Sequence, residues 1–223
     1  MHVESAAWTR AALAEIELAP GSRALDVGSS TLHYRTVEQP HIEEQVMAPL
    51  RVRGVQIIHL DAKPAPGVDV VCDLGTADPG LASRLGEHAL VLVCSVMQAL
   101  RDPGRAVDLA VRALAPGGHL VSHHPETARR SVDPVDYMLR LSPDELAGRF
   151  EREGLERVRA DSVRIDDPRY YRGLVSRPSW IPLWGRVWLP LPGVSEQARV
   201  RIPALRWKQS CVVMRRPAAT VTP

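Results

Sequence analysis

Acidic residues and a glycine stand where short apolar runs end, and their spacing could form a binding site. Asp26 and Gly28 close one run, and Asp61 and Asp73 close the next two. A carboxylate accepts hydrogen bonds from hydroxyl groups, and glycine lets a backbone approach a ligand closely because it has no Cβ. Ligands of open α/β sheets bind at the carboxyl ends of the strands. The spacing therefore predicts that these residues share one crevice, where the carboxylates could accept hydrogen bonds from a ligand.

Two adjacent histidines, His123 and His124, follow another apolar run and are predicted to face the same crevice. Histidine has a reference pKa of about 6.5, so it suits proton transfer near neutral pH. We predict that one of the two acts as a general base; the alternative is that both are loop residues bonded to backbone. His59 alternates within a strand pattern and is predicted to pack.

No metal site is predicted from the sequence. Cys72, Cys94 and Cys211 are far apart, in apolar stretches, and without a second cysteine or histidine at ligand spacing. They are predicted to be buried free thiols in a reducing compartment.

The elements that must position these residues alternate between β-branched runs and helical patterns, which is typical of a parallel sheet flanked by helices. Ser142, Pro143 and Glu145 predict a capping box with a first-turn proline, and that helix ends before Gly154. Further helices are predicted at 6–16, at 42–51 and from Asp102 until Pro116. Strands are predicted at 24–27, 55–60, 68–71, 90–94, from 120 onward, at 155–165 and at 211–214. The stretch 31–41 is expected to be an extra loop.

Length and composition favour one domain over 1–223. The 223 residues are 45% hydrophobic, and their formal net charge of +2 argues against a dedicated nucleic-acid binder. The longest apolar run, Ala89 to Met97, is too short to span a bilayer, and no export signal is evident. We therefore expect a cytoplasmic protein.

A segment rich in tryptophan and proline, 166–207, precedes the last predicted strand. Long segments of this kind usually cover functional sites, so a lid-like insertion is predicted, with Trp180 and Trp184 contacting the substrate. Two alternatives are a local hydrophobic cluster and a patch that contacts a membrane surface.

Four segments together resemble the class I S-adenosylmethionine-dependent methyltransferases. They are Leu25-Asp26-Val27-Gly28-Ser29-Ser30, Asp61, Asp73-Leu74 and Leu114-Ala115-Pro116-Gly117-Gly118. The resemblance implies a Rossmann-like, doubly wound, seven-stranded mixed sheet with an antiparallel last strand and helices on both faces. It also implies S-adenosylmethionine as cofactor and S-adenosylhomocysteine as product. The cofactor-binding residues would be Asp26, Gly28, Ser29, Ser30, Asp61, Asp73, Leu74 and Ser95. The chain departs from the family at Ser30 and Leu32, where relatives usually have glycines, and at Ala99, where many carry a histidine.

The resulting hypothesis is methyl transfer to a small molecule of specialised or sugar metabolism, with oxygen preferred over nitrogen as the accepting atom. Tyr34, Arg35 and His41 are predicted to contact this substrate, and a homodimer is compatible with the sequence. One alternative is a protein of the same fold that binds the cofactor and catalyses a non-methylating step or none. A nicotinamide-dependent oxidoreductase is disfavoured because no GxGxxG follows the first strand.

Overall fold

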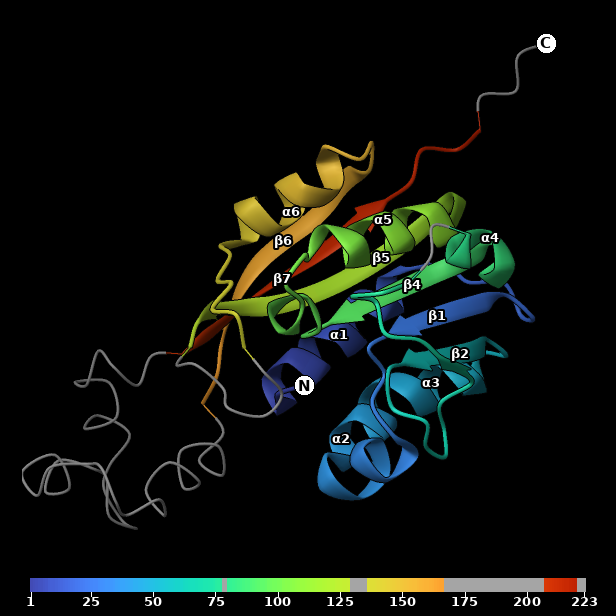
Figure 1. Cartoon of the computed structure of the whole chain (residues 1–223), viewed down its shortest axis with the longest axis horizontal. Coiled ribbons are helices and arrows are strands. Elements are labelled where there is room, and N and C mark those ends of the chain that lie inside the picture. The colour runs from blue at the N-terminus through green and yellow to red at the C-terminus, as the bar shows by residue number, and fades with distance from the viewer. Residues whose placement is uncertain (78–79, 129–135, 167–206, 220–223) are drawn as a thin grey trace, which may run out of the picture.

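The computed structural model describes residues 1–77, 80–128, 136–166 and 207–219. The strands within them are β1 (Arg23–Val27), β2 (Gln56–Asp61), β3 (Val70–Val71), β4 (His88–Cys94), β5 (Leu114–Thr127), β6 (Glu156–Arg164) and β7 (Lys208–Arg215). They form one sheet in the order β3-β2-β1-β4-β5-β7-β6 (Figure 1). β1 to β5 pair in parallel, whereas β7 is antiparallel to both of its neighbours. The predicted seven-stranded mixed sheet with an antiparallel last strand is confirmed.

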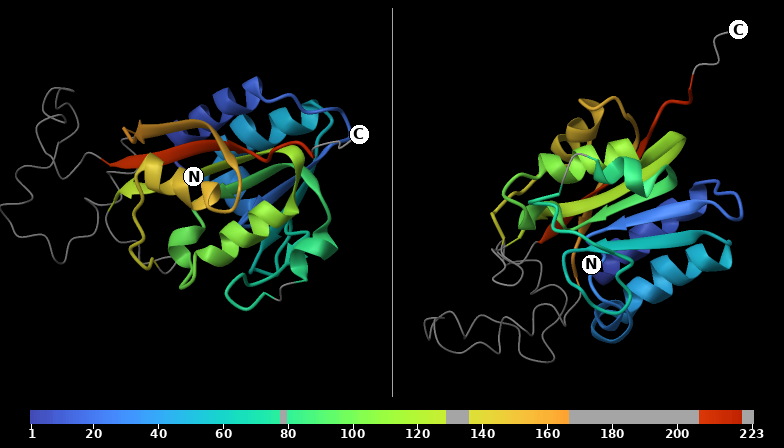
Figure 2. Two further views of the ribbon diagram at one scale, coloured as in Figure 1. Left: turned by 90° about the horizontal axis from the view of Figure 1, so that it is seen from above. Right: turned by 45° about the vertical axis from the view of Figure 1, so that its right-hand side comes forward.

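Helices cover both faces of the sheet (Figure 2). One face carries α1 (Val3–Glu15), the π-helical turns η1 (Tyr34–Glu38) and η2 (Glu43–Met47), α2 (Pro40–Ile42) and α3 (Ala48–Val52). The other carries α4 (Leu81–Leu85), α5 (Gly104–Ala113) and α6 (Pro143–Glu151). The expectation of a loop over 31–41 is wrong, because helical structure already begins at Tyr34.

Alternation along the strands gives each face its own core. Leu120 packs in the cluster below α5 and α6, whereas Val121 packs in the cluster below α1. This follows from the period of two in a strand, which sends neighbouring side chains to opposite faces. The same alternation separates His123 from His124.

The capping box of α6 is present as predicted. The Ser142 hydroxyl accepts from the backbone N–H of Glu145, and the Glu145 carboxylate accepts from the backbone N–H of Ser142 at 2.8 Å. For α5 the helix begins one residue later than expected, and Asp102 Oδ1 accepts from the Gly104 N–H at 3.0 Å.

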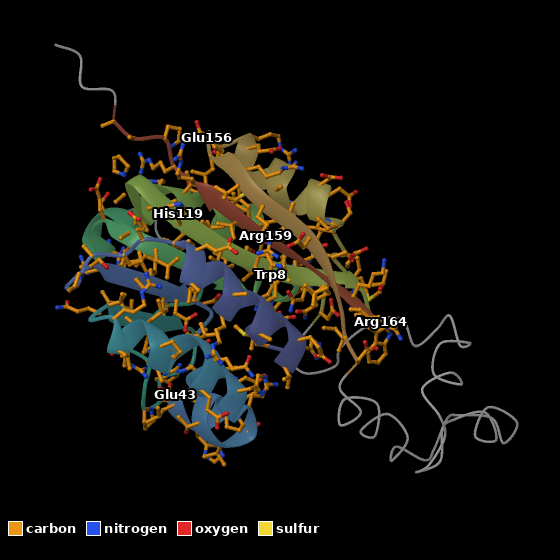
Figure 3. The ribbon with its side chains drawn as sticks, turned by 180° about the vertical axis from the view of Figure 1, so that it is seen from behind. Trp8, Glu43, His119, Glu156, Arg159 and Arg164 are labelled. Carbon is orange, nitrogen blue, oxygen red and sulfur yellow. The ribbon has the colours of Figure 1, made fainter. Side chains whose placement is uncertain are left out.

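Helix α1 is joined to the edge strand β6 on the rear face (Figure 3). The Trp8 indole donates to Asp161 Oδ2 at 2.8 Å, and the Arg159 guanidinium lies 5.3 Å from the centre of the Trp8 ring.

Among the described residues, no helix is long and apolar enough to cross a membrane. The predicted lid, with Trp180 and Trp184, lies outside the described residues apart from its ends, and the single-domain assignment stays a prediction.

Candidate cofactor and active site

The turn after β1 requires a glycine at position 28. Gly28 has a φ of +71°, and a Cβ there would stand 2.6 Å from Cγ2 of Val96, which follows β4. The backbone N–H groups of Gly28 and Ser29 both donate to the carbonyl of Leu60 in β2, at 2.8 and 3.0 Å. The missing Cβ therefore lets two chain segments approach each other at the carboxyl edge of the sheet (Figure 1).

Ser30 occupies a backbone conformation that favours glycine, with φ at +57°. Its N–H donates to Asp61 Oδ2 at 2.8 Å, and its carbonyl accepts from Arg35 Nη1 at 2.6 Å. These two bonds hold the turn where the family resemblance leads one to expect a second glycine.

Asp61 ends β2 with a carboxylate whose two oxygens are both oriented. Oδ2 accepts from Ser30 and Oδ1 accepts from the Lys63 N–H at 3.0 Å. The residue is half-buried, and a carboxylate oxygen can accept a second hydrogen bond. Asp61 can therefore accept from a pair of ligand hydroxyls.

Asp73 and Leu74, the next predicted pair, differ in exposure. Asp73 is exposed, and its Oδ1 accepts from the Gly75 N–H at 2.8 Å in a tight turn. Leu74 is buried in the core below α4 and α5. Only the carboxylate of this pair is exposed to solvent.

Asp26 is buried and paired with His59. Its Oδ2 lies 3.0 Å from Nδ1 of His59, directly across the β1–β2 ladder. The packing prediction for His59 missed this partner, because the register that places the two side by side is not visible in either strand alone.

Arg35 is only 1% exposed. Its Nη1 donates to the carbonyls of Ser29 and Ser30 at 3.0 and 2.6 Å, and its Nη2 donates to the carbonyl of Gly67 at 2.8 Å. It thereby joins the turn after β1 to the loop after β2. A substrate contact was predicted for Arg35, and this internal role was not.

Tyr34 and His41, the other two predicted substrate contacts, lie in the helical stretch between β1 and β2. Tyr34 packs, half-buried, against the core below α1. His41 Nε2 lies 2.8 Å from the carbonyl of Met1. Substrate contact by Tyr34 and by His41 stays a prediction.

The ends of β4 and β5 bring Ser95 and His123 together. Ser95 has a φ of +54°, and its Oγ lies 3.1 Å from His123 Nδ1. The His123 ring is fully buried, and its Nε2 has no hydrogen-bond partner. Burial lowers the pKa of His123 well below its ordinary value. The ring is therefore neutral at pH 7.

His124 points to the opposite face, where its Nε2 lies 3.1 Å from the carbonyl of Leu139. Burial lowers its pKa to about 4. The two predicted bases therefore do not share one site, and His123 is the one bonded to a residue of the crevice.

No protein-family model and no curated protein sequence matches the chain. Its fold, in contrast, matches many solved structures. The [4+2]-cyclase SpnF is 15% identical, with 96% of this chain and 82% of that chain covered and a TM-score of 0.59. A putative sarcosine dimethylglycine methyltransferase from Galdieria sulphuraria is 14% identical, with 95% and 85% covered and a TM-score of 0.57.

A third similar structure is the complex between the Haloferax volcanii Trm112 methyltransferase activator and the putative methyltransferase, at 19% identity, with 96% of this chain and 92% of that chain covered and a TM-score of 0.56. The strand order and the similarity to these solved structures point to the same fold. The fold is that of the class I S-adenosylmethionine-dependent methyltransferases. Within this methyltransferase fold, Gly28, Asp61 and Ser95 stand at one edge of the sheet, as the resemblance implied.

Two further features lie outside that edge. A cavity of about 400 Å³ between α4 and α5 shares only Leu74 with the predicted cofactor residues. In the described part of the methyltransferase fold, no three His, Cys, Asp or Glu side chains are grouped so that they could hold a metal ion.

Proposed function

We propose that the protein binds S-adenosylmethionine and transfers its methyl group to a small molecule. The observation that carries this proposal is the Asp61 carboxylate, which is fixed by the N–H groups of Ser30 and Lys63 and keeps capacity for two further hydroxyls. It lies beside the turn after β1 in a methyltransferase fold. When bound, the cofactor would supply an activated methyl group on a sulfonium.

The residues at this edge fit the parts of the cofactor. Asp61 would accept from the ribose hydroxyls, and the exposed carboxylate of Asp73 would accept from the adenine amine. The turn from Gly28 to Ser30 and the residue after β4, Ser95, would line the amino-acid arm. Asp26 would act behind this turn, since one of its oxygens already faces His59.

Proton removal from the acceptor is proposed to run through Ser95. His123 is buried, so a bound acceptor cannot reach its ring directly, but the half-buried Ser95 Oγ is bonded to Nδ1 of that ring. An acceptor hydroxyl would donate its proton to Ser95 Oγ while Ser95 passes its own proton to Nδ1. A hydroxyl acceptor must lose its proton to be methylated, and this relay would remove it. The preference for oxygen over nitrogen stays a prediction.

Mutation can distinguish His123, which belongs to the proposed relay, from His124, which does not. We expect Ser95→Ala and His123→Asn each to lower kcat about 100-fold or more, and the double variant to be no slower than the single ones. His124→Asn, on the other face of β5, should leave kcat within about threefold. Equal rates for all variants would contradict the relay.

A second candidate function is cofactor binding without methyl transfer. It is favoured by the similarity to SpnF, which is described as a cyclase, and by Ser30 in place of a glycine. Release of S-adenosylhomocysteine from S-adenosylmethionine in the presence of candidate acceptors would exclude it. Tight binding with no release for any acceptor would favour it.

Calorimetric titration with S-adenosylhomocysteine tests the cofactor site. Asp61→Ala removes a charged acceptor from two hydroxyls, each hydrogen bond contributing about 1.5 to 3 kcal/mol, so affinity should fall about 100-fold. Asp108→Ala is the matched control, because that carboxylate is exposed on α5 and pairs with Arg112, its one ion-pair partner among the described residues. Absence of binding by the wild-type protein, or equal affinities for wild type and Asp61→Ala, would overturn the proposal. A cytoplasmic location, a homodimer and a role for the segment 166–207 as a lid stay predictions.

A further inference from the structure

The segment that follows β5 exposes two large apolar side chains to solvent. Tyr137 is 44% exposed and Met138 is 47% exposed, and Met138 has a φ of +63°, which is unfavourable for a residue with a Cβ. Exposed apolar residues that stand singly are common and indicate no site. Here two of them are adjacent on a strained backbone, and strain of this kind gathers at functional sites.

The backbone below these two side chains is fixed by hydrogen bonds. The buried Asp136 carboxylate accepts from the Met138 N–H at 2.8 Å and from Nη1 and Nη2 of Arg140 at 3.1 and 2.6 Å. The Leu139 carbonyl accepts from Arg140 Nη1 at 2.8 Å. A surface that is ordered before a ligand binds loses little conformational entropy on binding.

This segment lies against the loop after β4, which begins at Ser95 (Figure 1). The Tyr137 N–H donates to the Gln98 carbonyl at 2.9 Å, and Arg101 Nε donates to the Tyr137 hydroxyl at 3.2 Å. The side-chain amide of Gln98 donates in turn to the Ser95 carbonyl at 2.7 Å. Tyr137 is therefore held, through its backbone and through its hydroxyl, beside the loop where methyl transfer is proposed.

The two exposed groups, an aromatic ring and a thioether, both favour an aromatic partner. Aromatic rings that stack or meet edge to face attract one another beyond the effect of the area they bury. A thioether sulfur makes a further favourable contact with an aromatic ring. A saturated ring has no π-system and gains neither of these contacts. The pair would therefore distinguish a planar acceptor from a saturated one of similar size.

We propose that Tyr137 and Met138 are specificity-determining residues that select an acceptor with an aromatic ring, such as a phenol, over a saturated alcohol. The acceptor ring would lie against Tyr137 and direct its hydroxyl toward Ser95 Oγ. Arg101 keeps the tyrosine ring in place through its bond to the hydroxyl. The inference rests on the proposed function and deepens it, because it names a substrate class for the same site.

The test compares 4-hydroxybenzoate with trans-4-hydroxycyclohexanecarboxylate, which carries the same hydroxyl and carboxylate on a saturated ring. Their affinities are measured by calorimetry in the presence of saturating S-adenosylhomocysteine. Binding is compared rather than turnover, because a phenol loses its proton more easily than an alcohol. We expect the wild-type protein to bind the aromatic probe at least about tenfold more tightly, which corresponds to about 1.4 kcal/mol.

Three variants assign this preference to the ring. Tyr137→Leu keeps an apolar side chain but removes the ring, so the ratio of the two affinities should fall below about threefold. Tyr137→Phe keeps the ring, so the ratio should persist. Val158→Ala is the control, because it shortens an exposed apolar side chain on β6 and should leave both affinities unchanged. Affinity for S-adenosylhomocysteine should be the same in all three variants as in the wild type.

Three results would overturn the inference. They are a wild-type ratio near one, a ratio that persists in Tyr137→Leu, and binding of neither probe by a protein that binds S-adenosylhomocysteine. If Tyr137→Leu lacks a cooperative thermal transition, Met138→Ala decides: affinity for the aromatic probe alone should fall about threefold, and an unchanged affinity would overturn the inference. Failure of the wild type to bind S-adenosylhomocysteine would instead overturn the proposed function, so the two failures are distinguishable.

Discussion

Two serines with left-handed backbone stand at the ends of neighbouring strands, and they are held by different kinds of group. Ser30, after β1, is fixed by the carboxylate of Asp61 and the guanidinium of Arg35. Ser95, after β4, is fixed by the backbone and the neutral ring of His123. Backbone conformations of this kind are costly for residues other than glycine and gather at functional sites.

The difference separates two tasks at one edge of the sheet. The carboxylate and the guanidinium that hold Ser30 carry charges that can attract and orient a ligand. The buried ring of His123, bonded to Ser95 Oγ, is the proton acceptor that we propose for methyl transfer. The first region therefore suits binding, and the second suits proton transfer.

Acid should affect the β4–β5 region first. The pKa of His124 is about 4 in the folded protein and about 6.5 in the unfolded chain, so below pH 6.5 the unfolded chain takes up a proton that the folded protein does not. Unfolding free energy should therefore fall by about 3 kcal/mol between pH 7 and pH 4, with His123 adding to the loss in the same direction.

Urea denaturation at both pH values measures this loss. His124→Gln should remove about 3 kcal/mol of the pH dependence. A pH dependence that is equal in wild type and His124→Gln would show that this region is not the acid-sensitive one.

Gly28→Ala should break the turn on the Ser30 side. It combines an unfavourable φ of +71° with a Cβ 2.6 Å from Val96, so the free energy of unfolding should fall by about 2 to 3 kcal/mol. Gly21→Ala is the matched control, because φ is +83° and nothing lies within 4 Å of the added Cβ. Adding Val96→Ala removes Cγ2 but leaves the Cβ of residue 96 at 2.8 Å, so it should recover only part of the difference between the two. Equal losses for Gly28→Ala and Gly21→Ala would contradict the clash.

Glycine at each serine gives the smallest and sharpest comparison. Ser30→Gly relieves backbone strain and keeps both backbone hydrogen bonds, so stability should stay equal or rise by about 1 kcal/mol. Ser95→Gly relieves similar strain but leaves the buried Nδ1 of His123 without its partner, so stability should fall by about 1 kcal/mol. Thermal and chemical denaturation of the two variants measure these changes in unfolding free energy. Changes of the same sign would contradict the difference between the Ser30 and Ser95 regions.

The sequence could predict elements whose signals are local. The capping box at Ser142 and Glu145 needs only neighbouring residues, and the sheet follows from strand patterns and from family motifs. The helical structure between Tyr34 and the predicted helix at 42–51 was missed because Pro40 interrupts it, and proline usually marks a boundary.

Contacts between distant segments could not be predicted. The burial of Arg35 depends on the loop at Gly67, which is distant in sequence. This loop packs so closely that a Cβ on Gly67 would stand 2.6 Å from Leu32 Cβ. The Asp26–His59 pair likewise depends on the register between β1 and β2. The two histidines could be predicted to lie near the crevice. Which of them contacts Ser95 could not be predicted, because it depends on the alternation of side chains along β5.

The position of β7 in the sheet affects how the chain folds during its synthesis. β7 lies between β5 and β6, although it is synthesised after both of them. Until Lys208–Arg215 has been synthesised, β5 and β6 have no partner along those edges, and unpaired edges promote association between chains. Nascent or truncated chains that end before Lys208 should therefore need chaperone protection, however well their first five strands have assembled.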